Sequence, residues 1–255
     1  MCLIFISVND HPDYNLVVAA NRDEFYNRKT APLHEWEDHP EIIGGRDLEA
    51  GGTWLGVTKS GRISMVTNYR DLKNIRLDAP SRGELVTNFL LSEKTGDEYL
   101  SELQPHAALY NGFNLIVGRV DTLWYCSNYR EGMEKLQPGQ YGLSNHLMDT
   151  PWPKVVRGKE KFRDILKIRF TAGDLFNLLL DDQIAADHQL PETGVGLERE
   201  RALSSMFIKS PGYGTRSSTV LLIDKKNNFF LTERVYDLTS FEFKENTFTF
   251  KLETP

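Results

Sequence analysis

The second residue of the chain is a cysteine, and this position could make it a nucleophile. If Met1 is removed, Cys2 carries a free α-amine beside its thiol. The ordinary pKa of a thiol is about 8.5 and that of an α-amine about 7.7 to 8.0, so the amine can accept the thiol proton near neutral pH. Nucleophile and base then lie within one residue. The alternative is a small buried residue that opens a strand, and position alone favours that alternative.

A charged cluster follows the second apolar segment of the chain. Residues 21–24 read Asn-Arg-Asp-Glu and come directly after the apolar residues 15–20. If residues 15–20 pair with the strand that begins at Cys2, Arg22 and Asp23 return to the thiol. A guanidinium lowers the pKa of a nearby thiol, and a carboxylate orients a nearby amine. A solvated, salt-bridged turn is the alternative.

Three further polar residues stand at the ends of apolar segments. The amides of Asn68 and Asn145 could donate hydrogen bonds to a developing oxyanion, and Arg216 could hold the oxyanion or the substrate. Arg216 lies in the glycine-containing segment 212–218. The alternatives are that each asparagine satisfies a local turn and that the glycines permit a sharp bend.

Composition excludes several other classes of protein. The 255 residues are 40% hydrophobic, and their net charge of −6 provides no basic field for nucleic acid. No apolar run reaches the length of a membrane span, and no basic segment opens a secretory signal. Two cysteines and scattered histidines predict neither a disulfide framework nor a metal site, and no cofactor is required. We expect a soluble cytoplasmic protein in which residues 1–255 form one domain; the oligomeric state stays open.

The elements that must position these residues are strand hairpins around a few helices. Short segments rich in β-branched and aromatic residues, separated by turn residues, predict the hairpins. Apolar spacing and helix-start residues predict helices over residues 81–92, 153–168 and 171–181. This order predicts an α+β layered fold. The predicted strands are residues 2–8, 15–20, 53–58, 62–67, 113–119, 122–127, 217–223, 228–234, 239–243 and 248–252.

The polar segment 186–201 holds one proline and two glycines. This composition predicts a surface loop that leads into a short helix. We regard the segment as the candidate for a mobile flap over a site.

Several blocks in this order resemble the NRDE family, the family of the transport and Golgi organisation protein 2. That family resembles the N-terminal nucleophile hydrolases, most closely the penicillin V acylase and bile salt hydrolase group. The resemblance implies a four-layer αββα sandwich of two antiparallel sheets flanked by helices. It extends from residue 1 to about residue 234. The blocks are Cys2 and residues 21–24, 51–56, 67–69, 82–86, 110–115, 141–145, 150–152 and 211–216.

The resemblance also implies roles for individual residues. The hydrolases place their aspartate three residues after the arginine, whereas Asp23 follows Arg22 directly, so Asp23 and Glu24 are both candidates for the acidic role. The implied catalytic set is Cys2, Arg22, Asp23, Asn68, Asn145 and Arg216. The substrate-binding candidates are Asn21, Glu24, Trp54, His146 and Tyr213.

The leading hypothesis is an amidohydrolase that cleaves a non-peptide acyl–nitrogen bond, or a related acyl bond, through Cys2. The ligand would be a small acyl or amide compound. One alternative is a non-catalytic carrier of haem or an acyl lipid on the same fold, although the sequence has no cysteine–proline or bis-histidine haem motif. Another is a structural protein that keeps the fold without activity. Cys126, in an alternating strand, is predicted to belong to the core.

Overall fold

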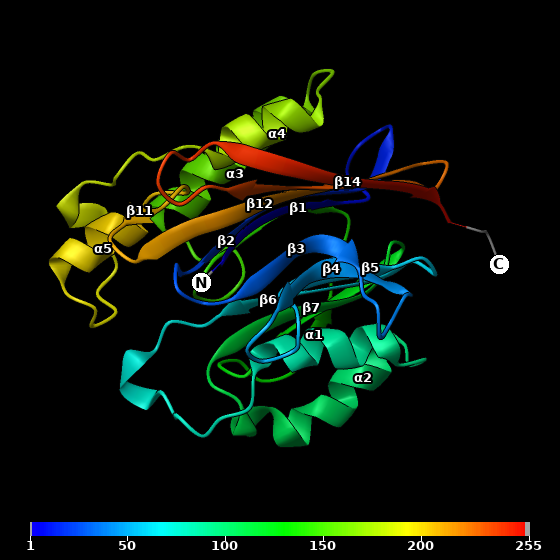
Figure 1. The fold of residues 1–255 in the computed structure, drawn as a ribbon, viewed down its shortest axis with the longest axis horizontal. Helices are drawn as coiled ribbons and strands as arrows, with labels where there is room; N and C mark the ends of the chain where they lie inside the picture. The colour runs from blue at the N-terminus through cyan, green and yellow to red at the C-terminus, as the bar shows by residue number, and fades with distance from the viewer. Residues whose placement is uncertain (1, 253–255) are drawn as a thin grey trace.

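Two antiparallel β-sheets stacked between helices make up the computed structural model (Figure 1). The structure describes residues 2–252, and within them each sheet has seven strands. We call the sheet that contains the N-terminal strand sheet A and the other sheet B. α3 (Pro153–Leu166) and α4 (Ala172–Leu179) cover the outer face of sheet A, and α1 (Arg82–Leu91) and α2 (Gly96–Leu103) cover that of sheet B (Figure 1). The layer order helix, sheet, sheet, helix confirms the predicted α+β architecture.

Sheet A carries the Cys2 and Asn-Arg-Asp-Glu segments at its centre. β1 (Cys2–Val8) pairs with β2 (Tyr14–Phe25), and β2 pairs on its other side with β12 (Tyr213–Asp224). β-Branched and aromatic side chains, which favour the extended conformation, dominate β1. The other strands of sheet A are β10 (Gly139–Leu143) beside β1, β13 (Asn228–Tyr236) and β14 (Phe243–Lys251) beyond β12, and β11 (Lys209–Ser210), which pairs with β12.

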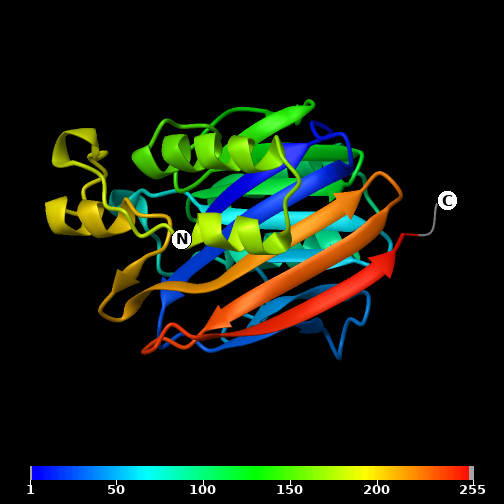
Figure 2. The same ribbon diagram turned by 90° about the horizontal axis from the view of Figure 1, so that it is seen from above.

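Sheet B is a meander in which each strand pairs with the next along the chain. Its strands are β3 (Thr30–Glu35), β4 (Ile42–Asp47), β5 (Leu55–Thr58), β6 (Arg62–Asn68), β7 (Phe113–Arg119), β8 (Thr122–Ser127) and β9 (Met133–Lys135). The shorter helices are η1 (Leu72–Asn74), η2 (Gln104–Leu109), η3 (Asp187–Gln189) and α5 (Leu197–Leu203). The segment from η3 to α5 lies at the end of the sandwich where β1 begins (Figures 1 and 2).

Side chains of β1 alternate between two apolar layers because successive residues of a strand point to opposite faces. Ile4 and Ile6 pack between the sheets, against residues of sheet B such as Met65. Leu3 and Phe5 pack instead with the helices that cover sheet A. By this alternation Cys2, two residues before Ile4, lies on the face that points toward sheet B.

Gly158 lets α3 approach the sheet closely, and replacing it gives a stability prediction. A Cβ at this position would lie 2.0 Å from Cζ of Phe5. Alanine normally stabilises a helix interior relative to glycine. Here the added methyl group would overlap with a packed core, and the cost of this overlap exceeds the gain in helix propensity. We expect Gly158→Ala to lower the free energy of unfolding by about 1 to 3 kcal/mol, measured by urea denaturation. Gly173→Ala on α4 is the control, since its Cβ would approach Thr171 Oγ1 alone, at 3.3 Å, and it should cost nothing measurable.

Glu233 links the two sheets and should make stability depend on pH. Its Oε2 atom accepts a 2.7 Å hydrogen bond from the Leu33 N–H of β3, and burial raises its pKa to about 7. A carboxyl whose pKa is raised on folding stabilises the fold below its unfolded pKa of about 4.3, and this contribution disappears as the pH rises through 7. In the native protein, the free energy of unfolding should fall by up to about 3 kcal/mol between pH 4.5 and 7.5. Glu233→Gln keeps an acceptor for Leu33 and should abolish this fall. Equal slopes of unfolding free energy against pH in both proteins would contradict this.

One predicted strand is wrong. Residues 239–242 form a turn and Phe243 begins β14, because the Asp237 carboxylate accepts hydrogen bonds from the N–H groups of Thr239 and Ser240 and Phe241 adopts a left-handed φ of 58°. The residues between the predicted strands 239–243 and 248–252 also belong to β14. Among the residues that the structure describes, no helix combines the length and apolar character that crossing a bilayer requires.

Candidate functional site

The strand register places Cys2 directly opposite Arg22. β1 and β2 pair so that Cys2 faces Arg22 and Leu3 faces Asn21, as the predicted hairpin requires. Arg22 is 6% exposed, and its guanidinium carbon lies 4.2 Å from the centre of the Trp54 ring. This cation–π contact fixes a positive charge on the face of sheet A that also carries Cys2.

Asp23 is buried beside this pair and is held by β12. Its Oδ1 accepts a 2.7 Å hydrogen bond from the Thr215 hydroxyl, which itself accepts one from the Ile208 N–H. Burial raises the pKa of Asp23, against the opposing charge of Lys154 and the Thr215 hydrogen bond. The charge of Asp23 adds to the raised pKa of the Cys2 thiol.

Glu24 and Tyr213 complete the surroundings of the thiol. Burial would raise the pKa of Glu24, but the Phe25 N–H and nearby positive charges, Arg22 among them, hold it below its ordinary value. The Tyr213 hydroxyl donates a 3.3 Å hydrogen bond to the Asp23 carbonyl oxygen. Burial raises the Tyr213 pKa well above 10, and the charges of Asp23, Glu24 and Cys2 add to this shift. Both residues therefore stay candidates for substrate contact.

Arg216 occupies a β-bulge next to the same cluster. The register between β2 and β12 shifts between Thr215 and Ser217, which leaves Arg216 as the extra residue. Its guanidinium donates hydrogen bonds to the carbonyl oxygens of Phe25, at 3.1 Å, and Arg28. The side chain thus holds the loop that follows β2.

The two predicted oxyanion asparagines are bonded to each other. Asn145 is fully buried, and its Nδ2 donates a 3.0 Å hydrogen bond to the Asn68 carbonyl oxygen. The Asn145 carbonyl oxygen accepts a 2.8 Å hydrogen bond from the Arg70 N–H. An amide nitrogen carries two protons, and the described contacts of Asn145 use one of them.

Asn21 and His146 are committed to contacts away from the thiol. The Asn21 amide donates to the carbonyl oxygens of Leu179 and Met206, both at 2.9 Å, which ties β2 to the helical layer. His146 bridges the hydroxyls of Tyr69 and Thr150, each at 2.8 Å. The described contacts therefore do not bring these two predicted substrate-binding residues to Cys2.

Three buried charged residues went unrecognised in the sequence: Lys154, Arg70 and Glu200. Lys154 is 1% exposed at the start of α3, and Arg70 forms a 2.9 Å ion pair with Glu200 of α5. Burial lowers the pKa of Lys154 to about 8, and Asp23, Arg70, Cys2 and Glu200 supply the charges around its amine. Arg82, at the start of α1, adds positive charge near Cys2 and Glu24.

Burial also raises the pKa of the Cys2 thiol, which Arg22 opposes in part. The thiol is thus protonated at neutral pH, and a base must remove its proton before it can attack a carbonyl carbon. Met1 lies outside the described residues, so the predicted base, the α-amine that its removal would create, stays a prediction.

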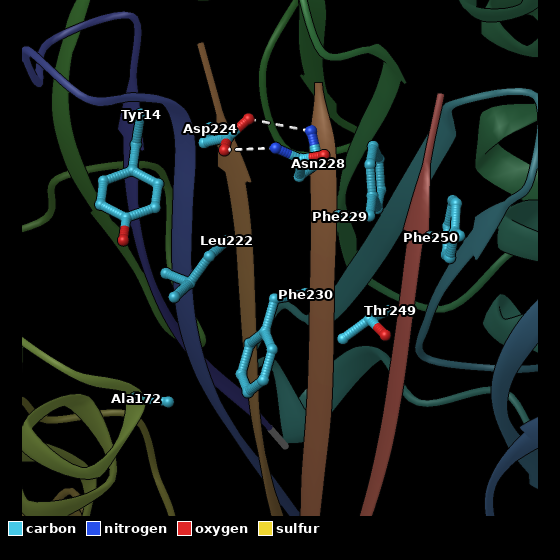
Figure 3. Close-up of a pocket in the computed structure, with 9 residues that line it drawn as sticks. All are labelled: Tyr14, Ala172, Leu222, Asp224, Asn228, Phe229, Phe230, Thr249 and Phe250. Carbon is cyan, nitrogen blue, oxygen red and sulfur yellow. Dashed lines mark hydrogen bonds between the residues drawn. The ribbon is translucent and has the colours of Figure 1, made fainter. Parts of the chain in front are cut away.

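Two open hollows of about 590 and 840 Å³ lie at the other end of β2, at Tyr14. Eight residues of strand, about 26 Å, separate Tyr14 from Arg22. Figure 3 shows Tyr14, Leu222 and Phe230 around the first hollow, with the Asp224–Asn228 hydrogen bond at its rim. The lining residues offer His11 and Tyr14 as side chains that could ligate a haem iron. Neither hollow belongs to the Cys2 site.

The architecture is the αββα fold of the N-terminal nucleophile hydrolases. The Caenorhabditis elegans ortholog of the N-acylethanolamine-hydrolyzing acid amidase aligns with 87% of this chain and 92% of its own, with a TM-score of 0.50 and 10% sequence identity. At this identity the likeness concerns the fold.

The sequence is 36% identical to the human transport and Golgi organization protein 2 homolog over 98% of this chain and 99% of that protein. It is 35% identical to the mouse homolog over the whole of both chains. The Transport and Golgi organisation 2 family model matches residues 1–238, and the chain belongs to this family. The predicted family resemblance is confirmed.

Proposed function

We propose that this protein is an amidohydrolase whose N-terminal Cys2 cleaves the acyl–nitrogen bond of a small amide. The observation that carries the proposal is the register that sets Cys2 opposite Arg22, with the buried Asp23 next to it. Nucleophile, positive charge and carboxylate then meet at the end of two paired strands. The fold of the family supports the same assignment.

Hydrolysis would proceed in two balanced steps. The α-amine of Cys2 takes the thiol proton, Sγ bonds to the acyl carbon, and the tetrahedral oxyanion collapses with cleavage of the C–N bond. The leaving amine receives that proton from the α-ammonium group. Water then attacks the thioester with the α-amine as base, and Sγ leaves to regain its proton.

Each neighbouring group has a part in this scheme. Asp23 orients the α-amine, and its anchor on Thr215 keeps the carboxylate in place. Arg22 stabilises the thiolate as it forms. The second N–H of Asn145, with Asn68 beside it, stabilises the oxyanion. Arg216 supports this site through the loop that it holds.

Intact-mass analysis and thiol labelling test the proposal. We expect loss of Met1, and alkylation of Cys2 by iodoacetamide at pH 7.5 at least about 10-fold faster than that of Cys126, because the α-amine assists Cys2 alone. Burial raises the pKa of Cys126 to about 12 and leaves it slow to react. Retention of Met1, or equally slow labelling of both thiols, would contradict the proposal.

The carrier predicted as an alternative shares the fold but turns nothing over. Incubation with an N-acyl aminocoumarin followed by an acid quench separates the two functions. An acyl adduct on Cys2 with release of aminocoumarin supports the hydrolase. Stoichiometric binding without adduct or release would assign the protein to the carriers.

A further inference from the structure

The last strand of sheet A, β14, ends the sheet without a neighbour on its outer side. It pairs with β13 along all nine of its residues, and among residues 2–252 no strand lies beyond it. In Figure 2, β14 (red) forms the rim of sheet A, away from the two helices that cover the strands at the centre. An open edge presents unpaired N–H and C=O groups to any chain that can extend the sheet.

The other three sheet edges are blocked or short. At β10, the Asp149 carboxylate accepts a 2.7 Å hydrogen bond from the Gly142 N–H, and the Asp149 N–H donates to the Gly142 carbonyl oxygen at 2.8 Å. β3 contains Pro32 and an irregular register, and β9 has three residues. β14 has neither proline nor glycine and its register is unbroken. Of the devices that prevent edge pairing, it carries only Lys244 and Lys251.

The hydrogen bonds between β13 and β14 show which backbone groups of β14 point outward. The Leu252 N–H donates a 3.0 Å hydrogen bond to the Asn227 carbonyl oxygen, and the Glu242 carbonyl oxygen accepts a 2.7 Å hydrogen bond from the Asp237 N–H. In an antiparallel pair, residues that bond to the neighbouring strand alternate with residues that point away from it. The even-numbered residues of β14 therefore bond to β13. The outward groups belong to Phe243, Glu245, Thr247, Thr249 and Lys251.

The sequence of β14 is complementary to a second copy of itself. Two copies related by a twofold axis run antiparallel, and their outward residues can bond only to outward residues. With the axis at Phe248, Glu245 lies opposite Lys251 and Thr247 lies opposite Thr249, and each pair occurs twice. Opposite charges and paired threonines stabilise facing strands. With the axis at Thr247, neither Glu245 nor Lys251 meets an opposite charge.

The side chains at this edge have surface and charge left for a partner. Phe248 and Phe250 pack against the core between the sheets with only part of their surface. Glu245 Oε2 accepts a 2.9 Å hydrogen bond from Arg234 Nε, which holds the carboxylate at the edge, while no ion pair of residues 2–252 includes Lys251. A second copy would cover the aromatic side chains and bring a carboxylate to Lys251.

We propose that β14 is a homodimer interface, at which two copies of this chain join by antiparallel pairing about a twofold axis at Phe248. The two copies of sheet A then form one continuous sheet. Residues 245–251 of the two copies exchange about eight backbone hydrogen bonds. One strand pair is a small interface, so we expect a dissociation constant in the micromolar range. The inference is independent of the proposed hydrolysis.

Sedimentation equilibrium measures the association directly. Between about 1 and 200 µM, the mass should rise from 29.2 kDa toward twice that value. Thr249→Pro removes an outward N–H and spares the bonds to β13, and it should raise the dissociation constant at least about 10-fold. Lys251→Glu sets two carboxylates opposite each other at both ends and should have a similar effect. The swap Glu245→Lys/Lys251→Glu restores the opposite charges and should return the constant to within about 3-fold of the native value.

Disulfide cross-linking tests the position of the axis, in a Cys2→Ala/Cys126→Ala background. Phe248→Cys should form an intermolecular disulfide on mild oxidation, because directly opposed residues of a non-hydrogen-bonded pair have Cβ atoms about 4.5 to 5.5 Å apart. Thr247→Cys should not, because its two copies are diagonal neighbours at about 7 to 8 Å. Non-reducing electrophoresis separates the products. Cross-linking of Thr247→Cys in preference to Phe248→Cys would overturn the proposed axis.

Lys135→Glu is the matched control, because it makes the same charge change on β9, at the edge of the other sheet. Its dissociation constant should stay within about 2-fold of the native value. A chain that remains at 29.2 kDa up to the highest concentration would overturn the interface, and this result requires no variant. A dimer that Thr249→Pro and Lys251→Glu leave equally strong would use another surface and would overturn the assignment to β14.

Discussion

Replacement of Cys2 by alanine should abolish amide hydrolysis, with a loss of at least about 10³-fold in kcat/KM. The variant retains the α-amine and deletes the one atom, Sγ, that bonds to the acyl carbon in the proposed mechanism. The neighbours of Sγ cannot replace it, because Arg22 is a cation and the Asp23 carboxylate is already hydrogen-bonded to Thr215. Release of aminocoumarin from N-acyl aminocoumarins of two to twelve carbons measures the effect.

Two further variants establish that this loss is chemical. Cys126→Ala removes the other thiol, in β8, and should leave kcat/KM within about 2-fold because that thiol is no part of the site. Cys2→Ser keeps a hydroxyl nucleophile and should retain more activity than Cys2→Ala. Full activity of Cys2→Ala would reject Cys2 as the nucleophile.

The sequence predicted the hairpin that assembles the site because local rules control it. Two apolar segments separated by the turn residues 9–13 can pair in few ways, and the observed register brings Arg22 to Cys2 as predicted. The second strand was predicted to end at Ala20, and the structure extends it. β2 continues to Phe25, so alternation turns Asn21 toward the helices and Arg22 toward sheet B.

The buried charges were harder to predict, although one of them left a local signal. Lys154, Gly158, Phe162 and Leu166 repeat every four residues and occupy the buried face of α3, so the stripe itself marks Lys154 as buried. Glu200 left no such signal. It belongs to a polar segment predicted as a surface flap, and a contact 130 residues away along the chain buries it against Arg70. Local periodicity carries no information about a contact of that range.

Removal of one partner of the buried ion pair between Arg70 and Glu200 should destabilise the protein strongly. Both side chains are buried, at 3% and 5% exposure, and their nitrogen and oxygen atoms are 2.9 Å apart. Removing one partner leaves the other charge desolvated, which typically costs 3 to 5 kcal/mol. We expect Arg70→Met to lower the free energy of unfolding by about that amount in urea at pH 7.

The double variant Arg70→Met/Glu200→Gln identifies the cause of that loss. With both charges gone, no charged member of the pair remains desolvated, so its unfolding free energy should return to within about 2 kcal/mol of the native protein. Glu200→Gln alone should be as costly as Arg70→Met, because it leaves the guanidinium without its anion. Additive losses in the double variant would mean that packing, rather than charge pairing, holds the segment from η3 to α5 against the site. Recovery would mean that the segment from η3 to α5 is held against the site mainly by one buried charge pair.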